Sequence, residues 1–175
     1  SRAADKVDST FQKFNSSQIG VVDHATVTGS TVNGNALAAG SVIINGFSIR
    51  ATDTSDDTFS STLPSTSAYA KAKAINDSTS VTGVTATART EMTANVINAS
   101  QTIYSGEILI NGVSVFSSDT EVLAGDGDNS IINAINGVSS QTGVSAKRAS
   151  TGLISLNSED GHNIRVQDTS TQQFL

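Results

Sequence analysis

Short runs rich in apolar residues lie on both sides of two Asn-Gly pairs in this chain of 175 residues. Asn45-Gly46 follows Val-Ile-Ile and precedes Phe-Ser-Ile, and Asn111-Gly112 follows Ile-Leu-Ile and precedes Val-Ser-Val. The pattern predicts two β-hairpins with two-residue loops, because both loop positions need a positive φ that Asn and Gly adopt readily. Strand alternation places four apolar residues of each hairpin on one face. They are Val42, Ile44, Phe47 and Ile49 in the first hairpin and Ile108, Ile110, Val113 and Val115 in the second.

A segment with helical spacing of apolar residues follows each hairpin and is expected to cover this face. The stripe of the later segment consists of Ile131, Ala134, Ile135 and Val138, and the thinner stripe of the earlier segment consists of Ala68, Ala72 and Ile75. Asp128 or Ser130 is the expected N-cap of the later helix, and Ser67 is the expected N-cap of the earlier one. Gly83 and Gly143, each preceded by Thr, then mark turns into strands over 84–88 and 144–148.

The last apolar alternation predicts a third hairpin over 153–166, with Asp160 and Gly161 at its turn. A two-residue loop would place Leu156 opposite Arg165, which is a poor pair. A three-residue loop with Gly161 in the left-handed conformation pairs apolar residues instead. We favour this second register, which places Leu156 opposite Ile164 and Ile154 opposite Val166.

These elements form an internal repeat. Gly40–Ile49 aligns with Gly106–Val115, and Ala74–Ala86 aligns with Ala134–Ala146, in the same order. Such self-similarity is typical of duplicated supersecondary units. The predicted fold class is therefore α+β and β-rich, with two tandem β-hairpin–helix–β units. The predicted organisation is an N-terminal connecting segment over 1–39, a first repeat over 40–105, a second repeat over 106–166 and a C-terminal tail over 167–175.

The connecting segment has weaker patterns of its own. Val7, Phe11 and Phe14 have helical spacing, and the Val/Thr alternation of Val21–Val32 predicts one or two strands.

Composition and charge narrow the possible functions. The chain has a net charge of −6 and a pI near 4.6, which disfavours binding to nucleic acid or to an anionic membrane surface. It contains no Cys, which excludes thiol catalysis, thiolate metal sites and disulfides. Ser and Thr together make up 48 residues, typical of a soluble β-rich surface or of an extracellular face with O-linked glycans.

The sequence contains few candidates for a catalytic or metal-binding site. His24 and His162 are the only histidines, and we interpret His162 as a histidine in a surface turn rather than a catalytic one. Asp126-Gly127-Asp128-Asn129 has the start of a calcium loop, but position 12 of that loop is Gly137, where an EF-hand needs Glu. A loop that ends in a helix cap fits better. We therefore predict no enzyme activity, no catalytic or metal site and no cofactor.

The spaced blocks of the repeat resemble the flagellin hook IN motif. The second repeat carries all of them, namely Ile110–Gly112, Ala134–Asn136, Thr142–Ala146, Leu153–Leu156 and Asp160–Val166. The first repeat carries Ile44–Gly46, Ala74–Asn76 and Thr82–Ala86 and lacks the closing Asp-Gly hairpin. The turn and motif residues expected to matter are Asn45, Gly46, Gly83, Asn111, Gly112, Gly143, Asp160 and Gly161.

The resemblance implies a structural role in motility. It suggests the outer domain of a bacterial flagellin, which is secreted, lies on the surface of the extracellular filament and contacts neighbouring flagellin subunits. A hook-associated or filament-cap protein is the alternative within the same class. An extracellular adhesin or glycan-binding module is a further alternative, for which Tyr69 and Tyr104 are the candidate exposed aromatic residues.

Overall fold

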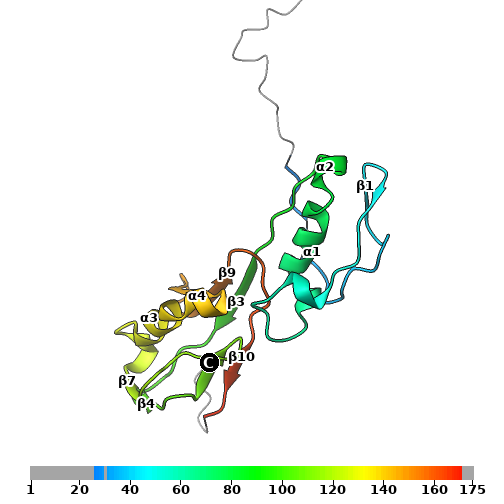
Figure 1. Cartoon of the computed structure of the whole chain (residues 1–175). Coiled ribbons are helices and arrows are strands. Elements are labelled where there is room, and N and C mark those ends of the chain that lie inside the picture. Colours follow the sequence, from blue (N-terminus) through cyan, green and yellow to red (C-terminus); the bar gives the residue numbers. More distant parts are fainter. Residues whose placement is uncertain (1–25, 30, 171–175) are drawn as a thin grey trace, which may run out of the picture. The chain divides into compact units, whose positions relative to one another are not determined.

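The computed structural model of the chain describes residues 26–29 and 31–170 (Figure 1). The chain divides into two compact units, Ser1–Val32 and Asn33–Leu175. The described residues of the first unit form no helix or strand and are exposed. All helices and strands given below belong to the second unit.

The second unit contains short strands, short helices and single 3-10 turns. The strands are β1 (Ile43–Ile44), β2 (Phe47–Ser48), β3 (Thr90–Ala94), β4 (Gln101–Ile103), β5 (Ile108–Ile110), β6 (Val113–Ser114), β7 (Thr120–Val122), β8 (Ser145–Arg148), β9 (Ile154–Ser158) and β10 (Val166–Asp168). The helices are α1 (Ala68–Asn76), α2 (Thr79–Thr82), α3 (Ser130–Gly137) and α4 (Ser139–Thr142), and the 3-10 turns are η1 (Thr54–Asp56), η2 (Pro64–Thr66) and η3 (Ala124–Asp126). The predicted α+β, β-rich class is confirmed.

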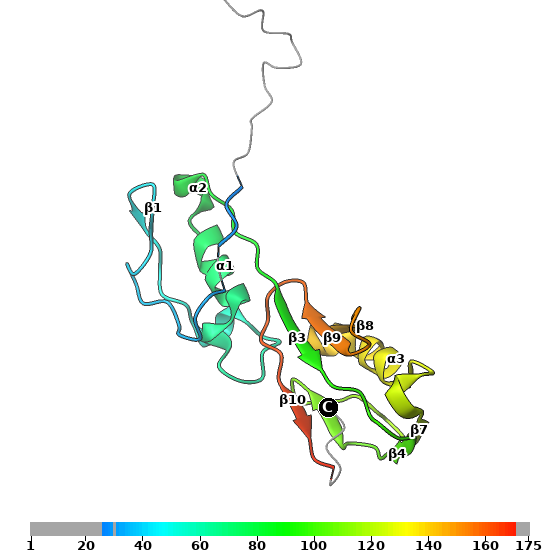
Figure 2. The ribbon, with the colours of Figure 1, turned by 180° about the vertical axis from the view of Figure 1, so that it is seen from behind.

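Both Asn-Gly hairpins form in the predicted register. Ile44 pairs with Phe47 across the first loop, and Ile110 pairs with Val113 across the second. The second hairpin gains a third strand, because β10 pairs antiparallel with the free edge of β5. Another three-stranded sheet has the order β3-β9-β8, and α3 packs on it against β8 (Figures 1 and 2).

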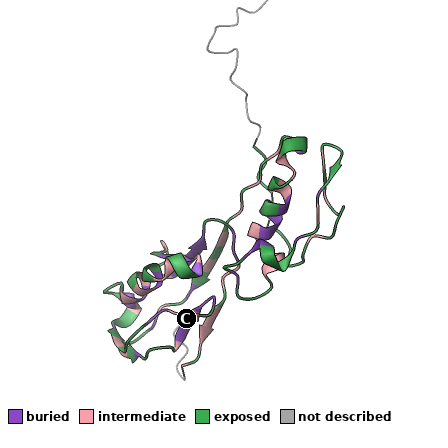
Figure 3. Cartoon of the chain, in the orientation of Figure 1, coloured by how far each residue is buried: buried purple, intermediate pink, exposed green. Residues whose placement is uncertain are grey.

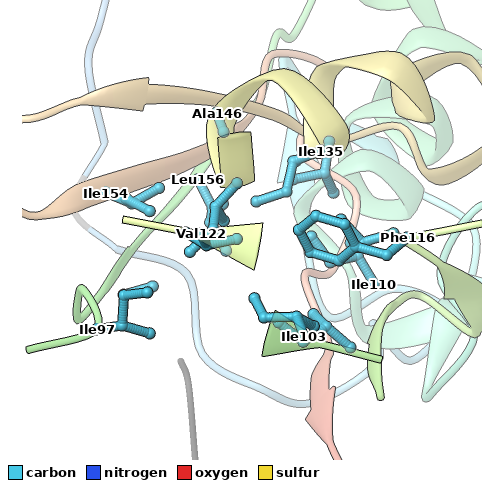
Figure 4. Close-up of a cluster of buried hydrophobic side chains, with 14 residues drawn as sticks. Ile97, Ile103, Ile110, Phe116, Val122, Ile135, Ala146, Ile154 and Leu156 are labelled. Atoms are coloured by element: carbon cyan, nitrogen blue, oxygen red, sulfur yellow. The ribbon is translucent and has the colours of Figure 1, made fainter. Parts of the chain in front are cut away.

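The main hydrophobic core lies between these two sheets and α3, and Figure 4 shows its side chains pointing toward one another. Its labelled members come from β4, β5, β7, α3, β8 and β9 and from two loops. They are Ile97, Ile103, Ile110, Phe116, Val122, Ile135, Ala146, Ile154 and Leu156. All of the fully buried core residues lie within 94–156, so this core belongs to the second repeat and to the segment just before it.

The predicted closing hairpin over 153–166 is wrong. The backbone does turn at Gly161, whose N–H donates to the Ser158 carbonyl at 3.1 Å. However, β9 has β3 on one edge and β8 on the other, so neither edge is open to a returning strand. The returning segment crosses to β5 instead, where Val166 lies opposite Ile110. The predicted pairs of Leu156 with Ile164 and of Ile154 with Val166 therefore do not exist.

The cap predicted for the later helix is also wrong. Neither Asp128 nor Ser130 is the N-cap of α3; Asn129 is, and its side chain makes no capping bond. The carboxylate of Asp126 caps the helix from further back, since the Ile131 N–H donates to it at 2.8 Å. Asp126 is fully buried, which gives this charge-assisted bond more weight than an exposed cap would have.

The earlier helix has the predicted cap, and of its predicted stripe only Ala72 is buried. The Ser67 hydroxyl accepts a hydrogen bond from the Ala70 N–H at 3.0 Å. Ala70 and Ala74 are fully buried, whereas the predicted stripe residues Ala68 and Ile75 are only half-buried.

The apolar face predicted for the first hairpin is only partly covered (Figure 3). Ile49 is buried, but Val42 and Ile44 are half-buried and Phe47 is 46% exposed. Among the described residues, the main core of buried apolar side chains lies within 94–156 and includes none from this hairpin, and no third strand pairs with β1.

The predictions for the flanks have mixed outcomes. The helix expected from Val7, Phe11 and Phe14 lies outside the described residues. The described part of Val21–Val32, residues 26–29 and 31–32, contains no strand. At the other end β10 runs to Asp168, and the Thr169 N–H donates to the Glu107 carbonyl at 2.8 Å, so ordered pairing extends into the predicted tail.

Candidate functional site

The Asn-Gly turns have the backbone geometry that their residue types favour. Asn45 and Asn111 both have a φ of 49°, and Gly46 and Gly112 have φ values of 84° and 85°. Positive φ at both loop positions defines the turn whose twist matches that of the flanking strands. The two hairpins are therefore equivalent in their backbone as well as in sequence.

The side chain of Asn111 joins its hairpin to two other segments. Its Nδ2 donates to the Thr142 carbonyl at 2.9 Å and to the Asn163 carbonyl at 3.0 Å. Its Oδ1 accepts from the Arg165 N–H at 2.9 Å. The equivalent Asn45 Nδ2 donates to the Thr82 carbonyl at 2.9 Å. One bond thus recurs in both hairpins, and the bonds to 163–165 exist only in the second.

The predicted Thr-Gly turns are left-handed ends of short helices. Gly83 ends α2 and Gly143 ends α4, each with a φ of 69°. Their N–H groups donate 2.8 Å bonds to the carbonyls of Thr79 and Ser139. Glycine is favoured at this position because an L side chain is strained there.

A second pair of asparagines holds each helix against the strand that follows it. The Asn136 side chain accepts from the Ala146 N–H at 2.8 Å and donates to the Ala146 carbonyl at 3.0 Å. Asn76 makes the same two bonds with Ala86, at 2.7 and 2.9 Å. These two residues end the repeated blocks Ala74–Asn76 and Ala134–Asn136, for which we predict no hydrogen-bonding role from the sequence. The recurrence of Asn at one position of both repeats is the signal that could have identified this role.

The Asp160-Gly161 turn packs tightly against the first repeat. The Gly161 carbonyl accepts from the Tyr69 N–H at 2.9 Å. A Cβ on Gly161 would lie 2.6 Å from the Cβ of Ala88, and the residue has a φ of +85°. Both the conformation and the space therefore require glycine here. Asp160 itself is exposed.

His162, interpreted from the sequence as a surface turn residue, is buried. Only 4% of it is exposed, and its Nδ1 lies 2.7 Å from Oδ1 of Asp57, which is also buried. The His162 ring contacts the rings of Phe59 and Tyr69, with centroids 4.9 and 4.2 Å away. The segment over 52–66, where the first repeat carries its extra residues, thus contacts the turn of the second repeat. Asp57 and His162 are 105 residues apart, and no local pattern indicates such a pair.

Asp57 is held as a carboxylate by its hydrogen bonds. Burial alone would raise its pKa, but hydrogen bonds from the Ser60 and Ser67 hydroxyls and from the Ser60 N–H, together with the adjacent His162 ring, outweigh burial, so the pKa of Asp57 lies below its ordinary value of 3.8. The Ser60 hydroxyl donates to Oδ2 at 2.5 Å. The same hydroxyl oxygen accepts from the Asn163 N–H at 2.7 Å, which extends the network into the second repeat.

A charged cluster lies beside α1. Arg50 bonds to Asp56 through both terminal nitrogens, at 2.7 and 2.8 Å, and also bonds to Asp77. Lys73 lies 3.0 Å from Asp56. Hydrogen bonding by Arg50 holds the pKa of Asp56 well below its usual range, against the effect of burial. The cluster links the end of the first hairpin to η1 and to the C-terminal part of α1, which is a structural role.

The chemistry of these sites is structural. In residues 26–29 and 31–170, no three His, Asp or Glu side chains are grouped so that they could hold a metal ion. The loop at 126–129 uses Asp126 as a helix cap, as described above, and Arg148 also bonds to its backbone. Within the same ranges, each helix is too short or too polar to cross a membrane.

Comparisons with known proteins agree with the resemblance drawn from the sequence. Residues 102–160 match the family described as the flagellin hook IN motif. The chain is also similar to Flagellin A of Helicobacter felis, with 36% identity over 104 residues, or 57% of this chain. The alignment covers 19% of that flagellin, so the chain spans about a fifth of its length.

These findings confirm the resemblance to bacterial flagellins and locate the motif. The matched range covers most of the second predicted repeat, including Asn111, Gly112, Gly143 and Asp160. The first predicted repeat, except for its last four residues, lies before the matched range, and its assignment to the same motif remains a prediction.

Proposed function

We propose, from the premise that residues 102–160 of this chain are a flagellin hook IN motif, that the chain is part of the outer domain of a bacterial flagellin. In this proposal the domain lies on the surface of the extracellular filament and serves motility. The observation that carries it is the family match, and the 36% identity to a flagellin supports it.

The nature of the site favours a structural role over catalysis. The side chains that recur between the repeats, Asn45 with Asn111 and Asn76 with Asn136, are all used to bond backbone groups. The buried Asp57 and His162 bond to each other and join the repeats. We therefore propose that the chain is not an enzyme and binds no cofactor.

Its partners in this proposal are neighbouring flagellin subunits. The net charge of −6 supports the further proposal that the domain binds neither nucleic acid nor an anionic membrane. The 48 Ser and Thr residues offer acceptors for O-linked glycans on an extracellular surface. Mass spectrometry of the protein from native filaments tests this point, and the expected result is hexose-sized or larger mass additions on Ser or Thr.

Immunogold labelling in the source bacterium tests the main proposal. Antibodies raised against this chain should decorate the filament along its whole length. A strain in which codons for residues 33–170 are deleted in frame should still form filaments, of smaller diameter, that bind no antibody. Label confined to the hook or to the filament tip would favour the hook-associated or cap alternative. Filaments without label would overturn the proposal.

A further inference from the structure

We propose that the free edge of β1 pairs antiparallel with the same edge of a second copy of this chain. This inference rests on the proposed function, because it names a surface through which two outer domains associate. It starts from a difference between the two repeats.

The second hairpin shows what the edge can accept. There, β10 lies along β5, with Leu109 opposite Gln167 and Ile110 opposite Val166. The Asn111 N–H donates to the Arg165 carbonyl at 2.9 Å. The edge of this hairpin is therefore a strand-binding surface, filled by a later part of the same repeat.

The first hairpin has the same edge with nothing on it. The Ile49 N–H donates to the Val42 carbonyl at 2.9 Å, as the Val115 N–H does to the Ile108 carbonyl. Antiparallel alternation then turns the N–H and carbonyl of Ile43 away from β2, as those of Leu109 are turned toward β10. Within residues 33–170, no strand pairs with this edge of β1.

The edge carries none of the usual devices that prevent strand pairing. Lys, Pro, a bulge or a covering loop protects most exposed edges. Here the sequence has no charged residue and no Pro from Asn33 to Ile49. Ile43 is 67% exposed and Phe47 is 46% exposed. An unguarded apolar edge of this kind is a template for another strand.

The distribution of charge permits a second copy as the occupant. Two chains of net charge −6 repel each other over most of their surface, and a neutral stretch of 17 residues lets their backbones approach. Arg50, the first charged residue after the hairpin, is neutralised by Asp56 and Asp77. Antiparallel pairing of one edge with itself also gives the closed two-fold symmetry that is commonest among dimers.

The repeat specifies the register. Ile110 lies opposite an apolar residue, Val166, in the second hairpin. The equivalent arrangement places Ile44 opposite Ile44 of the second copy and bonds the outward groups of Ile43 to Asn45 of that copy. Four strands in the order β2-β1-β1-β2 then form one sheet across the two molecules.

A second open edge lies nearby and is a poorer candidate. Thr85 and Thr87 flank Ala86, whose backbone is taken by Asn76, so their own polar groups face the opposite way. This edge borders a cleft of about 290 Å³ that is rimmed by Lys73, Glu159 and Asp160. Those charges must be desolvated before a strand can bind, and the β1 edge has no such requirement.

Sedimentation equilibrium of this chain tests the surface. Ile43→Lys places a charge on the edge at an exposed position and should weaken dimerisation at least tenfold. Leu123→Lys is the matched control, because Leu123 is 46% exposed and lies far along the sequence on a different loop. It should leave dimerisation unchanged. Equal thermal unfolding midpoints of both variants would verify that the fold is intact. Equal dimerisation of Ile43→Lys and the unchanged chain would overturn the proposal.

Disulfide trapping tests the register, and the absence of native Cys makes the product unambiguous. Ile44→Cys should form a covalent dimer on mild oxidation, whereas Thr87→Cys on the other open edge should remain monomeric. A dimer of Thr87→Cys alone, or a monomer in both cases, would overturn the proposal. If antibody labels the filaments but Ile44→Cys stays monomeric, only this inference is overturned. If antibody does not label the filaments, the proposed function itself is overturned.

Discussion

Asparagine side chains in this protein form backbone hydrogen bonds of the kind that an adjacent strand would form. Asn136 meets both polar backbone groups of Ala146, as a paired residue on an adjacent strand would. Asn76 does the same for Ala86, which belongs to no sheet. An Asn side chain ends in an NH2 donor group and a carbonyl acceptor, so it can satisfy an edge that would otherwise be exposed to water. Short strands are sufficient because these side chains complete their hydrogen bonding.

Gly161→Ala should be strongly destabilising. The substitution forces an L side chain to a φ of +85°, at a cost of about 1–2 kcal/mol, and also drives its Cβ to 2.6 Å from Ala88. Overpacking adds about 1–3 kcal/mol. Gly152→Ala is the control, since Gly152 has a φ of +84° and open space around it. Chemical denaturation should show a larger loss for Gly161→Ala. Equal losses would mean that the contact with Ala88 relaxes freely.

Asp57 should make stability depend on pH in the acid range. Its pKa in the folded protein lies below the ordinary value of 3.8, so the folded state binds fewer protons than the unfolded state near that pH. The stabilisation is complete above about pH 4 and is lost as pH falls through the folded pKa.

Urea unfolding of Asp57→Asn between pH 2.5 and 7 measures this contribution. The variant should be less stable at pH 7 and should lose less of its stability on acidification than the unchanged chain. Asp56, whose pKa is also lowered, should maintain part of the dependence of the unfolding free energy on pH. Glu159→Gln, an exposed carboxylate on the same turn region, should retain the full slope. An unchanged slope in Asp57→Asn would show that the pair with His162 does not contribute.

At the level of elements, α3 contributes two buried isoleucines to the core beside its sheet. Ile131 and Ile135 are fully buried on its inner face. Ile135→Ala should therefore cost about 2–5 kcal/mol, from lost burial and from the cavity that remains. Ile132→Ala removes the same atoms from a half-buried position of the same helix and should cost less. Denaturation midpoints of the two variants give the comparison, and an unchanged midpoint for Ile135→Ala would contradict this packing.

Elements set by local chemistry could be predicted from the sequence, and elements set by distant partners could not. Both Asn-Gly hairpins follow from the residues within and beside their loops. The return of the chain after Gly161 depends on which edges are already occupied, and β3 comes from more than 50 residues earlier. The cap of α3 shows the same limit at shorter range. Asp126 reaches the Ile131 N–H across five residues because a left-handed Asn129 shortens the path.

Over the whole second unit, the two repeats share a plan and differ in completeness. The second has a closing segment that supplies β9 and β10, and it contains the main core. The first lacks that segment, as its sequence indicated, and its chain runs on into β3, which completes the sheet of the second repeat. The contact of Asp57 with His162 also joins the two. The sequence indicated the duplication, but this dependence of the second repeat on the first arises only from tertiary pairing.

The isolated chain should remain monomeric or weakly dimeric and should form no filaments. Its longest helix among the described residues is α1, with nine residues, which is too short for an extended helical assembly interface. The charge of −6 opposes association, so raising the salt concentration should strengthen any dimer by screening that repulsion. Pairing of two β1 edges buries far less area than a standard interface.

The measurement is analytical ultracentrifugation at 20 mM and 500 mM salt, concentrations chosen to span about a fivefold change in Debye length. The expected result is a monomer at low salt and a small, concentration-dependent dimer fraction at high salt. Long polymers of this chain alone would show a self-assembling surface and would contradict its place in an outer domain.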